Sequence, residues 1–347
     1  MNKEFLPILE KIEQSLSSSL NMNFSQEWKN ASFENIPSTI KNEYIQKLIE
    51  PNEELISLGG KRWRPLLLIL CYKMIQQTKN PIISEKEIYS LTPLVEFVHT
   101  ASLIHDDIED NAELRRGKPS AHISYGLDTA LNAASWLYFE APVCINNLNA
   151  NIEFKNQLYQ IYTNELRKLH LGQAMDIFWH RNPDFFPTEE EYKAMVKCKT
   201  GTLASLAAQI GCISAGETKE YAIKIGEIAA NIGIGFQIID DVINLTSGNV
   251  GKKRGDDIVE GKKSLPILIH IKNHPEDKKI ISNFMKTASQ EGINSLAVEE
   301  CIKLLESSDC IKKAEQEGTS LIKENCKLLN SDLIQNLFTN MLPNFKV

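Results

Sequence analysis

The sequence lacks the features that mark membrane-spanning and secreted proteins. No continuous apolar run approaches the roughly 20 residues that a membrane-spanning helix needs, and the longest candidates, such as 66–71, are short. The first residues are interrupted by Glu10, Lys11 and Glu13, so they lack the apolar core of a secretory signal. Seven cysteines are scattered, odd in number and without a C-x-x-C pair, which favours a reducing compartment. We therefore expect a cytoplasmic protein with no stable membrane insertion.

An excess of positive charge is also missing. Lysine and arginine total 38 residues against 45 aspartates and glutamates, which gives a formal net charge of −7. This balance argues against a general binding surface for nucleic acid or for anionic membranes. Hydrophobic residues at 42% and charged residues at 24% are typical of globular proteins with a sizeable core.

Strand patterns are scarce too. The sequence shows no sustained alternation of apolar and polar residues between hairpin turns, and no regular exchange of strand-like and helix-like segments. Helical spacing recurs instead. Residues that predict where helices begin or end are Gly59, Pro65, Ser84 with Glu87, Pro93, and Thr188 with Glu191. We expect an all-α fold in a single domain over residues 1–347.

The segment 99–117, HTASLIHDDIEDNAELRRG, joins an apolar helical stretch to carboxylates and paired arginines. Asp106, Asp107 and Asp110 are placed by helical spacing on the side that carries His99, and carboxylates one turn apart can share a hard cation. Mg²⁺ prefers oxygen ligands and is usually held by one or two carboxylates together with substrate phosphate. The spacing predicts a metal bridge to a phosphorylated ligand, and a solvated acidic helix end is the alternative.

Two groups of basic residues suit the same kind of ligand. Arg115 and Arg116 supply planar guanidinium groups that match phosphate oxygens. Upstream, a turn presents Lys61, Arg62 and Arg64 at a helix start, where the positive end of the helix dipole disfavours cations unless an anion is bound. We interpret this turn as an anion site. The alternative is a set of three cations that extend into solvent.

A second acidic cluster far downstream decides between these alternatives. In 235–245, GFQIIDDVINL, Asp240 and Asp241 follow an apolar run, and Asn244 offers another oxygen ligand one turn later. Two such helices facing each other would make a cavity with metal at its mouth. With both clusters, the sequence from about 59 to 269 resembles the trans-isoprenyl diphosphate synthases, whose two aspartate-rich motifs hold a trinuclear magnesium cluster on an allylic diphosphate.

The resemblance implies a helical bundle around a central cavity and gives roles to the matching residues. The implied Mg²⁺ ligands are Asp106, Asp107, Asp110, Asp240, Asp241 and Asn244. The implied site for isopentenyl diphosphate consists of Gly60, Lys61, Arg64, His99 and Arg116. The implied contacts to the allylic diphosphate and its reacting carbon are Arg115, Gln173, Asp176, Lys199, Thr200, Gln237, Lys252 and Lys262, with Asp256 in the acidic set.

The implied reaction is head-to-tail elongation of an allylic diphosphate by isopentenyl diphosphate. Ionisation of the allylic substrate leaves a highly charged anion, which Mg²⁺ and preorganised cations would stabilise more in the transition state than in the substrate. Within the family, the chain resembles the geranylgeranyl diphosphate synthases in its second motif, Asp-Asp-x-x-Asn, in the stretch PTEEEYKAM, and in the lack of an insertion between Asp107 and Asp110. A homodimer is implied as well.

Other members and other classes of protein remain alternatives. A farnesyl or longer polyprenyl diphosphate synthase would have the same two substrates. A class I terpene cyclase would share the acidic clusters but has no need of a second diphosphate site at Lys61, Arg64 and His99. A non-catalytic prenyltransferase subunit typically loses one acidic motif, whereas this chain retains both.

Small residues upstream of Asp106 predict the length of the product. Ala101 and Ser102 leave the first helical turn open where an aromatic residue would stop the growing chain. An extended isoprene unit is about as long as one helical turn, about 5.4 Å, so the stop would lie deeper. Candidates for it are Leu94, Phe97, Trp136 and Phe139. We therefore expect a product of twenty carbons.

Overall fold

The computed structural model describes residues 3–20, 22–248 and 253–342. Internal contacts divide the chain into two compact units. Unit 1 comprises Met1–Asn164, Ser205–Gly226 and Ser331–Val347, and unit 2 comprises Glu165–Ala204 and Glu227–Asn330. Three helices contribute residues to both units, namely α10 (Ile152–Arg181), α12 (Thr202–Ser214) and α13 (Lys219–Thr246).

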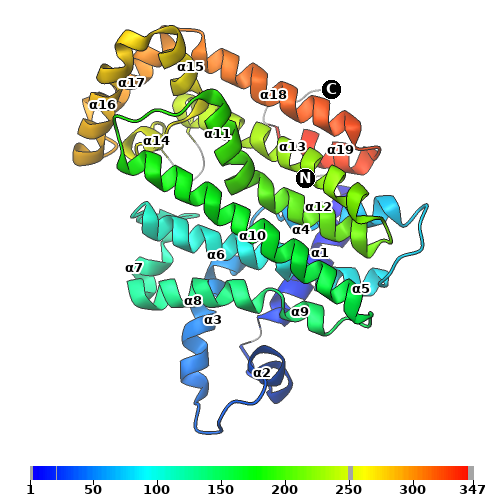
Figure 1. Cartoon of the computed structure of the whole chain (residues 1–347). Helices are drawn as coiled ribbons and strands as arrows, with labels where there is room; N and C mark the ends of the chain where they lie inside the picture. Colours follow the sequence, from blue (N-terminus) through cyan, green and yellow to red (C-terminus); the bar gives the residue numbers. More distant parts are fainter. Residues whose placement is uncertain (1–2, 21, 249–252, 343–347) are drawn as a thin grey trace. The chain divides into compact units, whose positions relative to one another are not determined.

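In its described part, unit 1 is helical apart from one short hairpin (Figure 1). Its further elements are η1 (Lys3–Phe5), α1 (Leu6–Ser19), α2 (Gln26–Phe33), α3 (Asn42–Ser57), α4 (Trp63–Ile75), α5 (Glu85–Ser90), α6 (Pro93–Glu109), β1 (Leu114–Arg115), β2 (Lys118–Pro119), α7 (Ala121–Tyr125), α8 (Leu127–Glu140), α9 (Val143–Asn146) and α19 (Asp332–Thr339). Helix α8 packs against both α3 and α6. This packing holds the helix that carries the first aspartates.

Unit 2 is helical throughout its described part. Its further elements are α11 (Glu189–Val196), the π-helical segment η2 (Lys197–Gly201), α14 (Asp256–Val259), α15 (Leu265–Asn273), η3 (Pro275–Asp277), α16 (Lys278–Glu291), α17 (Leu296–Glu306) and α18 (Cys310–Leu328). Helix α16 packs on α17, and α15 packs on α18 (Figure 1). The core between these helices includes apolar residues of α13, such as Ile238 and Val242, so the second aspartates are attached to a rigid support.

The predicted helix boundaries are confirmed. Helix α3 ends at Ser57, and Gly59 follows in the left-handed conformation with φ of +77°. Proline starts α6 at Pro93 and lies in the first turn of α4, where no backbone donor is lost. Complete capping boxes form in front of α5 and α11. In each, the side chain of the capping residue accepts a hydrogen bond from the backbone N–H of the glutamate three residues later, whose carboxylate accepts one from the backbone N–H of the capping residue. The all-α prediction is therefore correct.

The hairpin follows directly after the first aspartates. Strands β1 and β2 are antiparallel, and Arg115 pairs with Lys118. Arg116 and Gly117 connect them with φ of +53° and +78°, which is the backbone pattern of a tight type I′ turn. Glycine adopts such angles without cost, whereas arginine does so at some expense.

One of the residues predicted to stop the growing chain is wrong. Phe139 of α8 was expected beside the cavity, but it is 79% exposed, whereas its neighbour Tyr138 is buried. Trp136 is half-buried and stacks on Phe33 of α2, with ring centroids 6.1 Å apart. Consecutive residues of a helix point about 100° apart, so three aromatic residues within four positions cannot all face one side. Phe139 is therefore removed from the candidate residues that limit chain length.

Among the described residues, α13 alone is long and apolar enough to cross a membrane by length and composition. In the structure, 67% of its most apolar stretch is buried by other parts of the chain. A core helix passes the same test, so the composition of α13 is weak evidence for a membrane span.

Candidate active site

The first aspartates lie where α6 ends. Asp106 and Asp107 belong to its last turn, and Asp110 is the capping residue whose backbone N–H donates to the carbonyl of Asp106 at 2.8 Å. The side chains differ in exposure, because Asp106 and Asp110 are half-buried and Asp107 is only 1% exposed. The predicted single face thus separates into two half-buried carboxylates, suited to a cation, and one that points inward.

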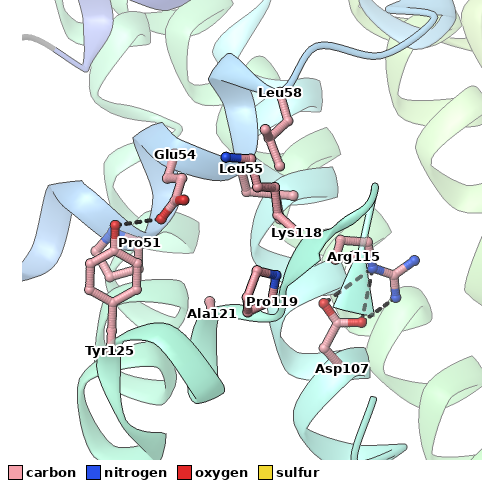
Figure 2. Close-up of a pocket in the computed structure, with 10 residues that line it drawn as sticks. All are labelled: Pro51, Glu54, Leu55, Leu58, Asp107, Arg115, Lys118, Pro119, Ala121 and Tyr125. Carbon is pink, nitrogen blue, oxygen red and sulfur yellow. Dashed lines mark hydrogen bonds and ion pairs between the residues drawn. The ribbon is translucent and has the colours of Figure 1, made fainter. Parts of the chain in front are cut away.

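Asp107 is paired with Arg115 of the hairpin. Figure 2 shows the two side chains pointing toward each other, and Nε of Arg115 donates to both carboxylate oxygens of Asp107, at 2.9 and 3.1 Å. Burial raises the pKa of Asp107, and the guanidinium of Arg115 opposes that rise. The structure therefore gives both residues a mutual contact, which the sequence did not indicate. Their roles toward metal and diphosphate stay predictions.

A small pocket adjoins this ion pair. Figure 2 shows its lining, which comes from the C-terminal end of α3, the last turn of α6, the hairpin and α7. The residues are Pro51, Glu54, Leu55, Leu58, Asp107, Arg115, Lys118, Pro119, Ala121 and Tyr125. Tyr125 donates a 2.5 Å hydrogen bond to Glu54 across it. This hydrogen bond joins α7 to α3 beside the first aspartates.

Arg64 and His99 lie together in unit 1, as predicted. Nη1 of Arg64 is 3.3 Å from Nε2 of His99, and its guanidinium covers the ring of Trp63 at 4.5 Å. Burial lowers the pKa of Arg64 to about 10, and it lowers the pKa of His99 well below its usual value with help from the charge of Arg64. At neutral pH the arginine is therefore charged and the histidine is neutral. Nε of Arg64 is buried and lacks a hydrogen-bond acceptor among the described residues.

Gly60 and Arg116 also lie together. Nη1 of Arg116 donates to the carbonyl of Leu55 at 3.2 Å and to that of Gly59. A side chain at Gly60 would approach Nη2 of Arg116 at 3.2 Å, so glycine allows the guanidinium to lie close to the backbone. The turn before α4 and the hairpin turn thereby present positive charge in the same region of unit 1.

Arg62 does not join this group. It has a left-handed backbone, with φ of +46°, and only 4% of its surface is exposed. Its guanidinium donates to Glu13 and to Glu96, each at 2.7 Å. The expectation that three cations are presented together is therefore wrong for Arg62, which instead binds α1 and α6 to the start of α4. Lys61, beside it, is exposed.

In unit 2, the residues of the second acidic motif have unlike surroundings. Asp240 is exposed, whereas Asp241 is 5% exposed and accepts hydrogen bonds from Tyr192, Gln237 and the backbone of Leu265. Burial and the nearby Asp257 raise the pKa of Asp241 to about 7.

Asn244 is also buried, and its side-chain oxygen accepts a 3.3 Å hydrogen bond from the backbone N–H of Asp257. This contact ties α13 to the start of α14. A role for Asn244 as a metal ligand stays a prediction, and Asp240 is the member of its motif with the most exposed carboxylate.

Asp176 and Lys199 form an ion pair, and both were predicted site residues. Nζ of Lys199 lies 2.6 Å from the carboxylate of Asp176, and Nε2 of His180 lies 2.8 Å from its other oxygen. Burial tends to raise the pKa of Asp176, but Lys199 and His180 outweigh it, and the result is a strongly lowered pKa. Gln173, one turn before Asp176, is half-buried.

The segment that carries Lys199 lies close against α10. A side chain at Gly172 would come within 2.4 Å of the backbone nitrogen of Lys199, so only glycine permits this approach. Thr200 follows and donates a 3.1 Å hydrogen bond to Gln237 of α13. Segment η2 is π-helical. This conformation is rare in proteins as a whole, and where it occurs it is often at a functional site.

The remaining predicted ligands follow α13. Lys262 is half-buried, forms an ion pair with Glu260, and has Nζ 3.8 Å from Asp257. The carboxylate of Asp256 accepts a 2.6 Å hydrogen bond from the backbone of Lys253. Lys252 lies outside the described residues, so its predicted role is untested.

Sequence reasoning missed Tyr192. Its hydroxyl donates a 2.6 Å hydrogen bond to Asp241, and the side chain is 2% exposed. Its position four residues after Thr188, in the first turns of α11, resembles that of any core tyrosine. No local signal distinguishes it, because its partner is 49 residues away.

The donor set suits a hard divalent cation. Asp106 and Asp110 in unit 1, and Asp240 in unit 2, offer carboxylate oxygens that solvent can reach. These are the ligands that Mg²⁺ and Ca²⁺ prefer.

Comparison with known proteins supports a common origin. A family model described as polyprenyl synthetase matches residues 45–305. Geranylgeranyl pyrophosphate synthase 2 of Zymoseptoria tritici is 34% identical over 284 residues, which cover 80% of this chain and 82% of the relative. Among eight similar curated proteins, the aligned part covers 66% to 82% of the relative's own length.

Solved structures share the fold. Geranylgeranyl pyrophosphate synthetase from Pyrococcus horikoshii superposes with a TM-score of 0.76 at 24% identity, covering 98% of each chain. Polyprenyl synthase from Caulobacter crescentus, complexed with calcium and isoprenyl diphosphate, gives a TM-score of 0.69 at 21% identity and covers 95% of this chain and 94% of that one. With the family match over most of its length, this chain belongs to the polyprenyl synthetase family.

Proposed function

We propose that the protein is a divalent-metal-dependent trans-prenyltransferase. It condenses isopentenyl diphosphate with an allylic diphosphate, and geranylgeranyl diphosphate is the proposed product. The family and the relatives named above support the reaction class. The observation in this structure that carries the proposal is Arg64, whose half-buried, charged side chain lies beside His99 and whose buried Nε donor has no acceptor among the described residues.

A buried donor without a partner costs free energy, about 1–3 kcal/mol, unless a ligand supplies the acceptor. An anion is the fitting ligand, because Arg64 and Arg116 both carry charge at neutral pH, and the charge of Arg116 helps burial to lower the pKa of Arg64. Their mutual repulsion favours the arrival of a diphosphate. Neutral His99 adds a hydrogen bond but no charge.

In the proposed reaction, Lys61, Arg64, His99 and Arg116 hold the diphosphate of isopentenyl diphosphate. Lys199, fixed by Asp176, supplies positive charge toward the allylic diphosphate. Mg²⁺, when bound through Asp106, Asp110 and Asp240, supplies the charge that stabilises the departing diphosphate. The residues of the chain thus act by positioning and electrostatics, with no covalent intermediate on the protein.

The test is incubation of the purified protein with isopentenyl diphosphate, Mg²⁺ and allylic diphosphates of five, ten or fifteen carbons. Mass spectrometry of the products should show elongation, ending at twenty carbons. Asp106→Asn should abolish elongation while far-ultraviolet circular dichroism stays unchanged, because the variant loses a charged metal ligand at a half-buried position. Full activity of this variant at saturating Mg²⁺ would contradict the metal assignment, and a cyclic hydrocarbon product would favour a terpene cyclase.

We further propose that the protein forms a homodimer through α8. Large apolar side chains lie exposed along it, with 57% of Leu127, 45% of Leu131 and 79% of Phe139 accessible. Residues four apart share one side of a helix, so these three form an apolar stripe. Exposed apolar stripes of this kind mark interaction surfaces.

Sedimentation should give twice the mass of one chain, and Phe139→Glu should shift it to the mass of a monomer. A wild-type monomer at micromolar concentration would contradict the proposal. We propose from composition and charge that the protein is cytoplasmic, is not embedded in a membrane and has no nucleic-acid partner. Fractionation of cells would test the location.

A further inference from the structure

Asp241 is held in unit 2 by donors from three helices. Tyr192 of α11 donates to Oδ2 at 2.6 Å, the backbone N–H of Leu265 at the start of α15 donates to the same oxygen at 3.2 Å, and Gln237 of α13 donates to Oδ1 at 3.1 Å. Only 5% of the Asp241 surface is exposed. Both oxygens therefore have protein partners, and the carboxylate is fixed in one orientation.

The contacts continue from Asp241 to the predicted allylic site. Gln237 uses its Nε2 for Asp241 and its Oε1 to accept the hydroxyl of Thr200 at 3.1 Å. Tyr192 and Thr200 belong to one continuous stretch, formed by α11 and η2. That stretch is consequently held by α13 at two points, through Asp241 at one end and Gln237 at the other.

Two fixed points matter here because the stretch between them is not a regular α-helix. Segment η2 has π-helical hydrogen bonding, which is seldom maintained without external support. It carries Lys199, whose Nζ lies 2.6 Å from Asp176. A slip of the segment by one residue would move Lys199 and Thr200 away from these partners.

We propose that Tyr192 is a positioning residue for prenyl transfer, whose hydroxyl fixes Asp241 and, through Gln237, sets the register of Lys199 and Thr200. The proposal rests on the proposed function. Tyr192 reaches the reaction only through Asp241 and Gln237, so it neither binds metal nor contacts substrate. Its loss should therefore weaken the hold on the allylic diphosphate and leave the site for isopentenyl diphosphate intact.

The test compares Tyr192→Phe with Tyr72→Phe. Tyr72 is a matched control, because its buried hydroxyl also donates one hydrogen bond, at 2.7 Å to the carbonyl of Ile83, and it lies in unit 1. Calorimetry measures the binding of inorganic diphosphate in the presence of Mg²⁺. Steady-state kinetics measure KM for each substrate, and thermal unfolding reports the structural loss.

Tyr192→Phe should bind diphosphate with Mg²⁺ about tenfold more weakly, as expected for one lost buried hydrogen bond. Its KM for the allylic diphosphate should rise, and its KM for isopentenyl diphosphate should stay the same. Tyr72→Phe should lose thermal stability to a similar degree and keep the diphosphate affinity of the wild type. Equal diphosphate affinity in the two variants would overturn the proposal.

A double-mutant cycle with Gln237→Leu tests the route of the effect. Because Tyr192 and Gln237 act through the same carboxylate, the double variant should lose less affinity than the sum of the single losses. Strict additivity would overturn the proposed route. If the wild-type protein binds diphosphate but elongates no allylic substrate, the proposed function fails, and the positioning role for prenyl transfer fails with it. If the wild-type protein and Tyr192→Phe both elongate normally, only the inference about Tyr192 fails.

Discussion

Replacing Gly172 with alanine would place a methyl group 2.4 Å from the backbone nitrogen of Lys199 and 2.8 Å from the carbonyl carbon of Cys198. Optimal separations for such atoms are about 3.5–4.0 Å, so α10 and η2 must separate by about 1 Å. Overpacking of this kind costs about 1–3 kcal/mol. The better helix propensity of alanine offsets about 1 kcal/mol of that cost. The expected net loss of unfolding free energy is about 0–2 kcal/mol.

Gly172→Ala should also lower the rate of the reaction, by more than the small loss of unfolding free energy alone would suggest. Lys199 is 2.6 Å from Asp176, and a displacement of about 1 Å at such a site can lower a rate by about a hundredfold. We expect kcat/KM for the allylic diphosphate to fall by about ten- to a hundredfold in Gly172→Ala. The assay is initial-rate elongation with radiolabelled isopentenyl diphosphate, below the unfolding midpoint of the variant.

Gly211→Ala provides the control. Its methyl group would lie 2.4 Å from the carbonyl oxygen of Leu68, so the steric conflict is equally severe, but it lies between α12 and α4 inside unit 1. Gly211→Ala should lose stability and keep kcat/KM in the fraction that remains folded. If Gly172→Ala retains wild-type kcat/KM, or if both variants lose it equally, close packing of α10 on η2 does not position Lys199.

Three further variants test other parts of the structure. Lys61→Ala should raise KM for isopentenyl diphosphate more than KM for the allylic substrate; equal changes in steady-state kinetics would contradict two separate sites. Ala101→Phe, at a fully buried position of α6, should shorten the product below twenty carbons, and an unchanged product distribution by mass spectrometry would refute this. Burial raises the pKa of Glu140 from 4.5 to about 7. Between these two pH values Glu140 stays protonated in the folded state but is ionised in the unfolded state, so the free energy of unfolding falls as the pH rises. Glu140→Gln should be more stable than the wild type at pH 8 by roughly 1–3 kcal/mol and should lack this slope; parallel pH profiles of the unfolding midpoint would contradict it.

The sequence predicted the features of this fold that depend on neighbouring residues. Capping boxes, prolines at helix starts and the glycine after α3 each act within four residues, so their spacing is visible in the chain. Asp176 and Lys199 were assigned to one site, and Arg64 and His99 to another, only because a family resemblance connected distant motifs; the ion pair of Asp176 with Lys199 was not predicted. Periodicity contains no information about such contacts.

Other features could not be predicted because they depend on the direction of one side chain. Arg62 follows the exposed Lys61 in a basic turn, but its left-handed backbone turns the guanidinium inward to Glu13 and Glu96. Tyr192 gives no signal, since its partner Asp241 is remote in sequence. Phe139 was named as a candidate to stop the growing chain because it is large and aromatic, but the side of α8 on which it lies is exposed.

The burial of Arg62 is one case of a pattern in paired polar residues. Several pairs of consecutive residues with the same charge, here called doublets, differ in burial: the first residue is exposed or half-buried, and the second is almost fully buried. The doublets are Lys61 with Arg62, Asp106 with Asp107, Asp240 with Asp241, and Lys262 with Lys263. Where the doublet is helical, the two side chains point about 100° apart, so one faces the ligand side when the other faces the core. The inner member is stabilised by protein partners, because an unpaired buried charge would cost too much. The outer member of each doublet is therefore the more accessible candidate ligand, and the inner member already has protein partners; the metal-binding roles of Asp107 and Asp241 stay predictions. Neutral substitution of an inner member should first lower stability, whereas neutral substitution of an outer member should first lower affinity for metal or diphosphate.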